Sequence, residues 1–521
     1  MKRIKSKWSI TVAVLLYALL AVYFFQFYRY QINPDAVSYI SIAQKYLSGD
    51  FSLAVNGYWS PFFSWLMIPL LLMGIEPLIA AKIMILTVGA FTVWGVGILA
   101  SKLRIEKEIR IVIVIFSAPL ILGYAFHSTT PDLLTVCTLI YYLTFALHKD
   151  YPKKKHTALW AGVFGALAYL SKAYNFAFFL AHFILLNFTL FLIKDTDSKK
   201  RKRIANSFVK GILTFFVISG IWIFSISQKY DKFTIGTSGK YNYSVIGPQS
   251  KGHPTHYRGF LPPHDEKSIS AWDDPSYFIV KGWSPFSSRE NFKHQLDIIR
   301  KNIEAYLSSY SICLISVVFA LFYILKSLKK GYSKDINEFF IICAIFIYPI
   351  GYFLIIIEQR LIRILSVLTI LIGGYILTNL FRTKFFNKLV KNVTLIFFAL
   401  SILYSSVAFF KNPRYRYRER GIYELSNVLR KYNIKGKVAS SKQSWPLALY
   451  LAHYLKFKYY GETKAEAEAD EDLLKNDLEK YDIDYFIIRD RENDVFMKDY
   501  EEVTKKERPG IKVYNLKKRR K

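Results

Sequence analysis

Two aspartates stand where a helix is predicted to begin beside an apolar run. Asp35 lies in the stretch 32–40, INPDAVSYI, directly after an apolar run that is long enough to cross a bilayer. Asp132 follows Thr130 and Pro131 at the start of another apolar run. A polar residue, a proline and then an acid are typical of a helix start. Each acid therefore has two explanations, helix capping and proton transfer.

Basic residues accompany the two acids. Lys172 lies in LSKAYN, and Arg360 and Arg363 lie in EQRLIR. Charges at membrane depth cost free energy unless they are paired or used. For each of these three cations, snorkelling or an ion pair of the kind that Glu358 offers would explain the charge without any chemistry.

Composition predicts an integral membrane protein. The chain has 521 residues, of which 52% are hydrophobic and 17% aromatic, more than a soluble domain needs. The formal net charge of +32 is explained by Lys and Arg gathered in cytoplasmic loops. We therefore expect the lipid bilayer as a partner and no nucleic acid.

Apolar segments of helical length predict about eleven transmembrane helices. The first, from Trp8 to Tyr28, is read as a retained first helix. The segments are 8–28, 77–100, 109–124, 131–148, 157–171, 174–193, 207–227, 302–326, 336–357, 361–380 and 390–410.

Charge predicts the orientation of these helices. If the N-terminus is cytoplasmic, every second connection should be basic, and the connections follow this alternation. The basic clusters are Lys102/Arg104/Lys107/Arg110, Lys149/Lys153/Lys154/Lys155, Lys199/Lys200/Arg201/Lys202/Arg203, Lys326/Lys329/Lys330 and Arg382/Lys384/Lys388. The run from Pro61 to Met73 is too short to span and is read as re-entrant or interfacial. Both acids and the three cations then share the outer face of a multi-pass protein of the cell (inner) membrane.

The same topology predicts two domains. Residues 1–410 form the transmembrane module, with an outer loop at 29–60 and an outer insert at 228–301. Residues 411–521 form an extracytoplasmic α/β domain, because helix-like stretches alternate with strand-like ones. The predicted helices are 420–432, 445–456 and 462–480, and the predicted strands are 437–441, 457–461 and 484–489. The final KKRRK is interpreted as a solvated tail.

The insert is rich in aromatic residues, Gly, Pro and His, and we expect it to cover the site. His253 and His256 form HxxH, which with Asp265 or Asp273 would suit a metal, but no HExxH motif is present. The sequence therefore assigns no metal ligands and no certain cofactor, and leaves a divalent cation open.

Several stretches together resemble one family over most of the chain. They are PDAVSYISIAQKYLSGD, NGYWSPFFSWL, TTPDLL, LSKAYN and EQRLIR. They look like the GT-C superfamily of membrane glycosyltransferases. Within it the chain is similar to the polyprenyl-phosphate-sugar group of protein mannosyltransferases and aminoarabinose transferases, especially RgtA/B/C/D-like members. Aminoarabinose transferases have a Glu-Lys pair before Pro-Pro where this chain has Trp59-Ser60-Pro61, which argues against lipid A modification.

The resemblance implies roles for named residues. Asp35 would be the catalytic base, and Asp132 would be a second catalytic acid, which supports the site. Lys172, Arg360 and Arg363 would hold the donor phosphate. Aromatic and histidine side chains of the outer loop and insert would bind substrate: Tyr39, Tyr58, Trp59 and His253.

The predicted function is an inverting glycosyltransferase for a hexose or pentose. It moves the sugar from a polyprenyl-phosphate donor to a hydroxyl of a glycan, lipid or protein acceptor. A carboxylate accepts the hydroxyl proton, and cations stabilise the departing phosphate. Inversion follows from one carboxylate acting opposite the phosphate, whereas a double displacement would need Asp132 on the other face of the sugar.

Two other functions fit a polytopic chain. A transporter or flippase of lipid-linked sugars should show paired repeats, interrupted helices and charges near the midplane. A noncatalytic membrane assembly protein predicts that replacing Asp35 by Asn is silent.

Overall fold

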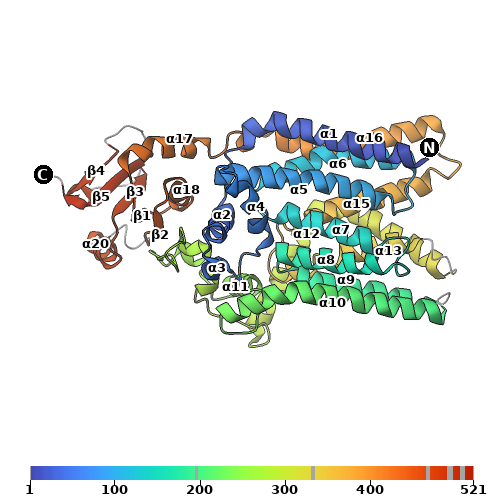
Figure 1. Cartoon of the computed structure of the whole chain (residues 1–521), viewed down its shortest axis with the longest axis horizontal. Helices are drawn as coiled ribbons and strands as arrows, with labels where there is room; N and C mark the ends of the chain where they lie inside the picture. The colour runs from blue at the N-terminus through green and yellow to red at the C-terminus, as the bar shows by residue number, and fades with distance from the viewer. Residues whose placement is uncertain are drawn as a thin grey trace.

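A computed structural model shows an elongated molecule with a helical bundle at one end and a smaller α/β domain at the other (Figure 1). The structure describes residues 2–193, 197–329, 335–464, 470–489, 497–504 and 511–519. The N-terminus lies at the far end of the bundle, and the C-terminus lies beyond the sheet.

All eleven predicted apolar segments are helical. The helices are α1 Lys2–Tyr28, α5 Pro77–Ala100, α6 Lys107–His127, α7 Asp132–Ala146, α8 Lys155–Ser171, α9 Asn175–Leu192, α10 Ser198–Lys229, α12 Arg289–Lys329, α13 Ile336–Ile347 with the short α14 Ile350–Phe353, α15 Arg363–Leu380 and α16 Lys388–Lys411. Within the described residues, seven of these meet both the length and the hydropathy needed to cross a membrane: α1, α5, α6, α9, α10, α13 with α14, and α15. The chain is therefore a polytopic helical membrane protein.

Two helices extend well beyond their apolar segments. α12 has 41 residues, which at 1.5 Å per residue is about 60 Å, roughly twice the hydrocarbon thickness. Its first half alternates charged and apolar residues, so the apolar run detects only the second half. α10 likewise begins within the basic stretch 199–203, before its apolar part.

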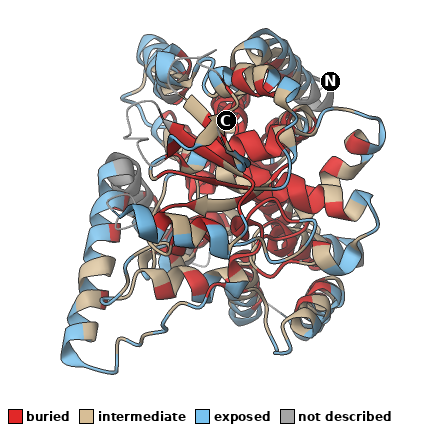
Figure 2. Ribbon diagram, turned by 90° about the vertical axis from the view of Figure 1, so that its left-hand side faces the viewer, coloured by how far each residue is buried: buried red, intermediate tan, exposed pale blue. Residues whose placement is uncertain are grey.

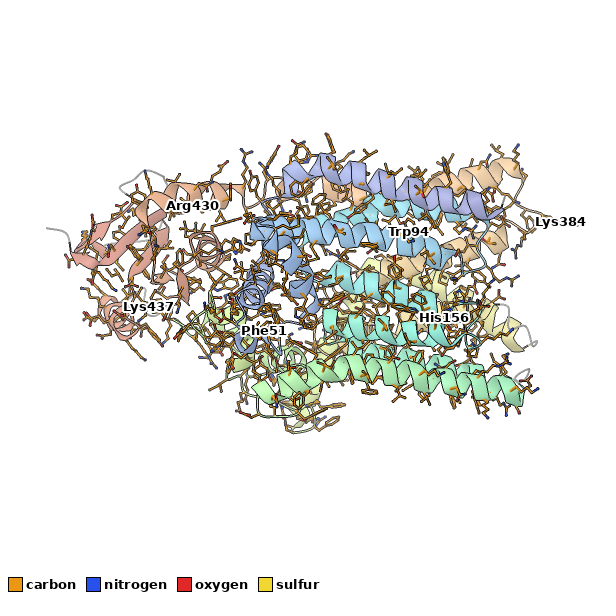
Figure 3. The ribbon with its side chains drawn as sticks, viewed as in Figure 1. Phe51, Trp94, His156, Lys384, Arg430 and Lys437 are labelled. Atoms are coloured by element: carbon orange, nitrogen blue, oxygen red, sulfur yellow. The ribbon has the colours of Figure 1, made fainter. Side chains whose placement is uncertain are left out.

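The bundle has two chemically different ends. The connections at the end where the N-terminus lies include the basic stretches around residues 102, 153 and 384, and Lys384 marks this end (Figure 3). At the opposite end, beside the α/β domain, α1 and α8 finish and α7 and α15 begin. The basic connections predicted from the sequence therefore lie at one end of the bundle, and the connections between them lie at the other end.

Three short helices lie between the bundle and the α/β domain (Figure 1): α2 Pro34–Leu47, α3 Phe51–Ala54 and α4 Phe62–Leu72. α4 packs against α2, where the Ser64 hydroxyl donates to the Tyr39 carbonyl over 2.8 Å. With 11 residues, α4 is about 16 Å long and too short to span the hydrocarbon core.

In its described residues, the C-terminal domain is a five-stranded sheet with helices. Its elements are α17 Arg420–Leu429, β1 Lys437–Ser440, α18 Trp445–Leu455, β2 Lys458–Glu462, α20 Glu471–Lys480, β3 Tyr485–Arg489, β4 Tyr500–Glu502 and β5 Ile511–Arg519. The strand order is β2-β1-β3-β5-β4, with β2, β1 and β3 parallel and β5 antiparallel to both neighbours. The interpretation of the basic terminus as a solvated tail is wrong for residues 517–519, because β5 pairs them into the sheet.

Both the bundle and the α/β domain contain buried residues. Viewed from the α/β end, buried residues fill the centre and exposed residues form the rim (Figure 2). Val438 and Phe486 of the central strands are fully buried. Val438 pairs with Tyr485 of β3, so Phe486, the next residue of β3, points to the opposite face of the sheet from Val438. Because both side chains are fully buried, the middle of the sheet is covered on both faces.

The insert joins α2 to the α/β domain. It contains α11 Ser238–Val245 and three single turns at Pro254–His256, Ala271–Asp273 and Pro275–Tyr277. The Tyr459 amide of edge strand β2 donates to the Ile269 carbonyl over 2.8 Å, so the insert covers part of that edge. On α2, Lys45 pairs with Asp265 at 2.9 Å, and the Ser41 hydroxyl donates to Asp273.

The two ends of the bundle give a topological prediction. A reporter fused after Ala125 or at Lys411 should read as external, and one at Lys200 as cytoplasmic, because positive charge is retained inside. Reporter activity in intact cells is the measurement. Labels of the opposite sign would place Asp35 in the cytoplasm and contradict the predicted orientation.

Candidate active site

Asp35 is not the cap of its helix. The side chain of Asn33 accepts a hydrogen bond from the Ala36 amide over 2.7 Å, which is the capping contact of α2. Pro34 occupies the first helical position, where no amide hydrogen is required. The local sequence thus satisfies the helix start without Asp35, whose carboxylate is available for other contacts.

The carboxylate of Asp35 meets Arg360. The Arg360 Nη1 lies 2.8 Å from Asp35 Oδ2, and its Nε lies 2.7 Å from Glu358 Oε2. Asp35 is 19% exposed and Arg360 30%, so a substrate can reach both. Burial opposes the charge on Arg360, but the carboxylates of Asp35, Asp132 and Glu358 outweigh it and raise the pKa of Arg360. The arginine therefore stays charged between acids from three elements.

Asp132 is held by Lys172. Asp132 begins α7, and Lys172 directly follows the end of α8. The two side chains form an ion pair, and the Thr130 hydroxyl also donates to Asp132. The Asp132 side chain is only 1% exposed. A carboxylate so deeply buried needs its counter-charge. The ion pair with Asp132 therefore accounts for the charge of Lys172 within the protein itself.

Arg363 lies deeper than Arg360. It begins α15, is 5% exposed and donates from Nη1 to the Tyr124 carbonyl over 3.1 Å. Its guanidinium also lies over the Tyr124 ring, 4.9 Å from the centroid. The charge of Arg363 acts on Asp132. The stretch 358–363 thus delivers two arginines to the same cluster.

The predicted substrate-binding residues Tyr39, Tyr58 and Trp59 lie near Asp35. The pKa of Tyr39 is raised by burial and then by the negative charges of Asp35 and Asp132. Tyr58 lies beside Trp59, with ring centroids 4.5 Å apart, and is within the field of Asp35. Trp59 is buried and donates from Nε1 to the Trp272 carbonyl over 3.1 Å.

His253 packs against Tyr241 and Trp272, within the insert. Its Nε2 is 3.0 Å from the Tyr241 hydroxyl and its Nδ1 is 2.8 Å from the Thr255 hydroxyl. Burial lowers its pKa to about 4, so it is neutral at pH 7. Both ring nitrogens are used inside the insert. The rings of Tyr241 and Trp272 each contact both His253 and Tyr58.

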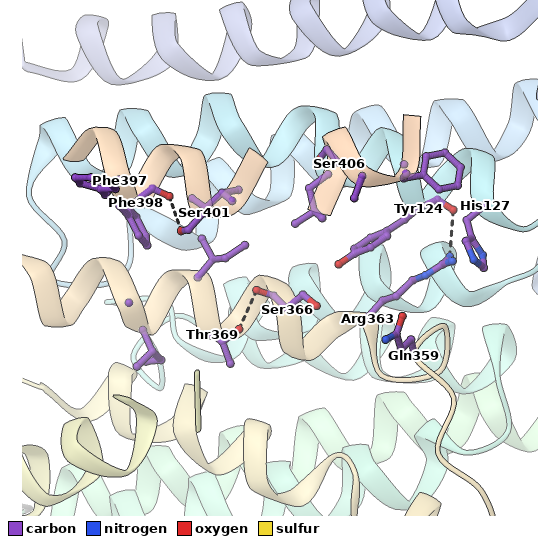
Figure 4. Close-up of a pocket in the computed structure, with 18 of the residues that line it drawn as sticks. Tyr124, His127, Gln359, Arg363, Ser366, Thr369, Phe397, Phe398, Ser401 and Ser406 are labelled. Atoms are coloured by element: carbon purple, nitrogen blue, oxygen red, sulfur yellow. Dashed lines mark hydrogen bonds between the residues drawn. The ribbon is translucent and has the colours of Figure 1, made fainter. Parts of the chain in front are cut away.

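An elongated groove opens from the arginines between α6, α15 and α16 (Figure 4). Its volume is about 1010 Å³. Arg363, Gln359 and His127 stand at one end, and Phe397 and Phe398 at the other. The groove follows α15 along most of its 18 residues, which corresponds to about 25 Å. Its shape suits a long apolar chain that carries a negative group at one end.

The groove is not predicted by the amino-acid sequence. Its signal is a stripe of small and hydroxyl residues on one face of α15, Ser366, Thr369 and Gly373, at helical spacing. The facing residues of α16, such as Ser401 and Phe398, cannot be matched to that stripe without the packing. The missed polar residues at its charged end are His127 and Gln359.

A residue of the C-terminal domain also reaches the site. Tyr450 of α18 is buried, and its hydroxyl lies in the fields of Glu419 and Asp35. α18 packs against α2, the helix that carries Asp35. Nothing in the local sequence of α18 indicates this contact, because it depends on how the domain docks.

No protein-family model and no curated protein matches the sequence. Solved structures do match. The archaeal oligosaccharyltransferase AglB from Archaeoglobus fulgidus, in complex with an inhibitory peptide and a dolichol-phosphate, has a TM-score of 0.55 at 11% identity, covering 93% of this chain and 69% of that chain. ArnT from Cupriavidus metallidurans, bound to undecaprenyl phosphate, has a TM-score of 0.52 at 13% identity, covering 96% and 97%.

A third structure, the arabinofuranosyltransferase AftD from Mycobacteria, has a TM-score of 0.53 at 13% identity, covering 98% of this chain and 40% of that chain. At such identities the likeness concerns the fold. The fold predicted from the sequence, a GT-C-type helical membrane module followed by an α/β domain, is confirmed.

The Asp132–Lys172 pair gives a stability prediction. Replacing Lys172 by Met should lower the free energy of unfolding by about 3–5 kcal/mol, because the buried Asp132 carboxylate loses its partner. Thermal unfolding in detergent is the measurement. The double variant Asp132→Asn/Lys172→Met, which leaves no buried charge, should recover much of the loss. If the stability of Lys172→Met were unchanged and donor binding were weakened, Lys172 would instead be assigned to binding the donor phosphate.

Proposed function

We propose that this chain, whose fold is that of the GT-C glycosyltransferases, transfers a sugar from a polyprenyl-phosphate donor to an acceptor hydroxyl. The single observation that carries the proposal is the position of Asp35. Its carboxylate is released from helix capping by Asn33 and faces Arg360 at the mouth of the apolar groove. A base, a cation and a channel for a lipid chain therefore meet at one point.

The donor would lie along the groove. Its polyprenyl chain would occupy the apolar surface between α15 and α16, and its phosphate would meet Arg360 and Arg363 at the charged end. Two of the solved structures with this fold contain a polyprenyl phosphate, dolichol-phosphate in AglB and undecaprenyl phosphate in ArnT. A planar guanidinium holds a phosphate through two parallel hydrogen bonds. Lys172 would contribute mainly through its charge, since Asp132 holds its ammonium.

The proposed reaction is a single displacement. Asp35 accepts the proton of the acceptor hydroxyl as its oxygen bonds to the anomeric carbon, and the bond from that carbon to the phosphate oxygen breaks. The departing phosphate takes the electron pair, and Arg360 stabilises the negative charge that grows on it. Attack opposite the phosphate inverts the anomeric centre. Asp132 is buried against Lys172, which supports a positioning role and disfavours a covalent intermediate.

A divalent cation is not used in this scheme. Asp35 faces Arg360 and Asp132 faces Lys172, so each acid is already neutralised by a protein cation. Among the described residues no three His, Cys, Asp or Glu side chains form a group that could hold a metal. The HxxH of the insert does not supply one, since His253 is bound within the insert.

The proposed setting is the outer face of the cell (inner) membrane. The N-terminus would be cytoplasmic and the C-terminal domain extracytoplasmic, with a glycan, lipid or protein hydroxyl as acceptor. A transporter of lipid-linked sugars would place its charges near the middle of the bundle. Here the charges of the cluster lie at helix ends: Asp132 and Arg363 begin helices, and Lys172 follows one.

Asp35→Asn tests the base directly. The variant nearly preserves shape and leaves the Asn33 cap intact, but its amide cannot accept the proton, so transfer should fall by roughly a hundredfold or more. The measurement is the transfer rate with a polyprenyl-phosphate sugar, at equal protein in the membrane. Donor binding should remain.

Glu358→Gln is the matched control for this variant. It also removes one carboxylate from Arg360, yet Glu358 has no role as base, so transfer should fall less than about tenfold. Equal losses in the two variants would assign the effect to Arg360. Normal transfer by Asp35→Asn would reject Asp35 as base and move the role to Asp132.

Gly373→Leu tests the groove. A Cβ at Gly373 would lie 3.3 Å from the Phe398 ring, so a larger side chain narrows the channel. We expect the KM for a long polyprenyl donor to rise about tenfold and that for a short-chain donor to rise much less. Gly220→Leu on α10, where an added Cβ meets nothing within 4 Å, is the control. An equal effect on both donors would place the lipid chain elsewhere.

A further inference from the structure

A buried acid and a buried base that the proposed mechanism does not use lie where the C-terminal domain leaves the bundle. Lys82 of α5 is fully buried, and the Glu419 side chain, just before α17, is 8% exposed. Within the described residues, neither the Lys82 ammonium nor Glu419 Oε2 has a hydrogen-bond partner. Each charge acts on the other. Burying two charges is costly, so their placement calls for a role.

The segment that carries Glu419 is bound to the segment that leads to Asp35. The Tyr417 amide donates to the Phe27 carbonyl over 2.8 Å, and the Gln31 amide group donates to the Tyr415 carbonyl over 3.0 Å. The Glu419 carboxylate lies against the amide of Ile32, three residues before Asp35. The connection between the two domains therefore runs along the entry to α2.

The backbone of this connection is strained. Tyr417 and Glu419 both have positive φ, 55° and 58°, a conformation that costs non-glycine residues of order 1 kcal/mol. Such residues persist only where surrounding contacts hold them. Glu419 has such a contact, since Arg418 Nε lies 2.7 Å from Oε1, and Lys82 attracts its carboxylate electrostatically.

The other side of the same joint is α18. Its Tyr450 hydroxyl lies in the fields of both Glu419 and Asp35. The Glu419 carboxylate thus interacts electrostatically with Lys82 of α5, with the Ile32 amide at the entry to α2 and with Tyr450 of α18. Replacing Glu419 would therefore alter its interactions with all three of these elements.

We propose that Glu419 is a positioning residue that, together with Lys82, fixes the entry to α2 and so holds the Asp35 carboxylate against Arg360. Its effect on transfer rests on the proposed function, but its effect on the backbone at Ile32 does not. Because Glu419 does not contact Arg360 or Arg363, its loss should reduce turnover and leave donor binding unchanged.

The test compares Glu419→Gln, Lys82→Met and the double variant in the full-length protein. Hydrogen–deuterium exchange of the amides at 32–37 should rise about tenfold in Glu419→Gln, and kcat should fall about tenfold with the donor KM within twofold. The double variant should recover part of both, because it leaves no unpaired buried charge. Glu424→Gln, which breaks an exposed pair with Arg420, is the control and should change neither.

Glu419→Asp serves if the Gln variant fails to fold, because it keeps the charge and withdraws it from Ile32. Unchanged exchange and kcat in a folded variant would overturn the proposal. A lower melting temperature with unchanged kcat would also overturn it, since that is what a merely structural role predicts. A wild-type protein without transfer activity would reject the proposed function, while the exchange data would still decide whether Glu419 holds the entry to α2.

Discussion

The contact between Arg360 and Asp35 is the interaction on which the rest of the site depends. A carboxylate near the membrane surface is useful as a base only if it is ordered and accessible. Arg360 holds the Asp35 carboxylate at 2.8 Å while 19% of that side chain stays exposed. The same guanidinium is balanced by Glu358 and by the charge of Asp132. Acids and cations from distant parts of the chain therefore form one cluster in which each charge has a counter-charge. A phosphate that enters this cluster would compete with Asp35 for Arg360, which would couple donor binding to release of the base.

Much of the remaining architecture holds α2 in place beneath that contact. Asn33 caps the helix, so its first turn does not need Asp35. The insert grips the middle and end of α2 through Ser41 and Lys45, and the same insert pairs with the edge of the C-terminal sheet. Burial raises the pKa of Asp273, which accepts from Ser41, to about 6, so this grip includes a carboxylate that is costly to ionise. Outer loop, insert and C-terminal domain thus act as one support, although they are far apart in sequence.

The groove extends from the charged cluster along α15 and α16. Small and hydroxyl side chains on one face of α15 leave room beside α16, and the arginines close one end. An apolar chain in such a channel exchanges lipid for protein contacts at little cost, so the specificity of binding would come from the charged end. The groove in the bundle would therefore hold the lipid chain of the proposed donor, while the domains outside the bundle shape the space around Asp35. This division explains why the charges gather at the helix ends instead of the middle of the bundle.

The amino-acid sequence was sufficient to predict the helical segments, the alternation of basic loops and most of the α/β elements, because these depend on local apolar runs, charge and periodicity. It also selected Asp35, Asp132, Lys172, Arg360 and Arg363, which the structure brings together. It could not decide whether Asp35 caps its helix, because Asn33 and Asp35 are both suitable residues near one helix start. Three features arise only when the chain folds: Lys172 pairs with Asp132, His253 is hydrogen-bonded within the insert, and a groove lies beside α15. Those outcomes depend on distances between elements tens to hundreds of residues apart, which packing sets and local sequence does not encode.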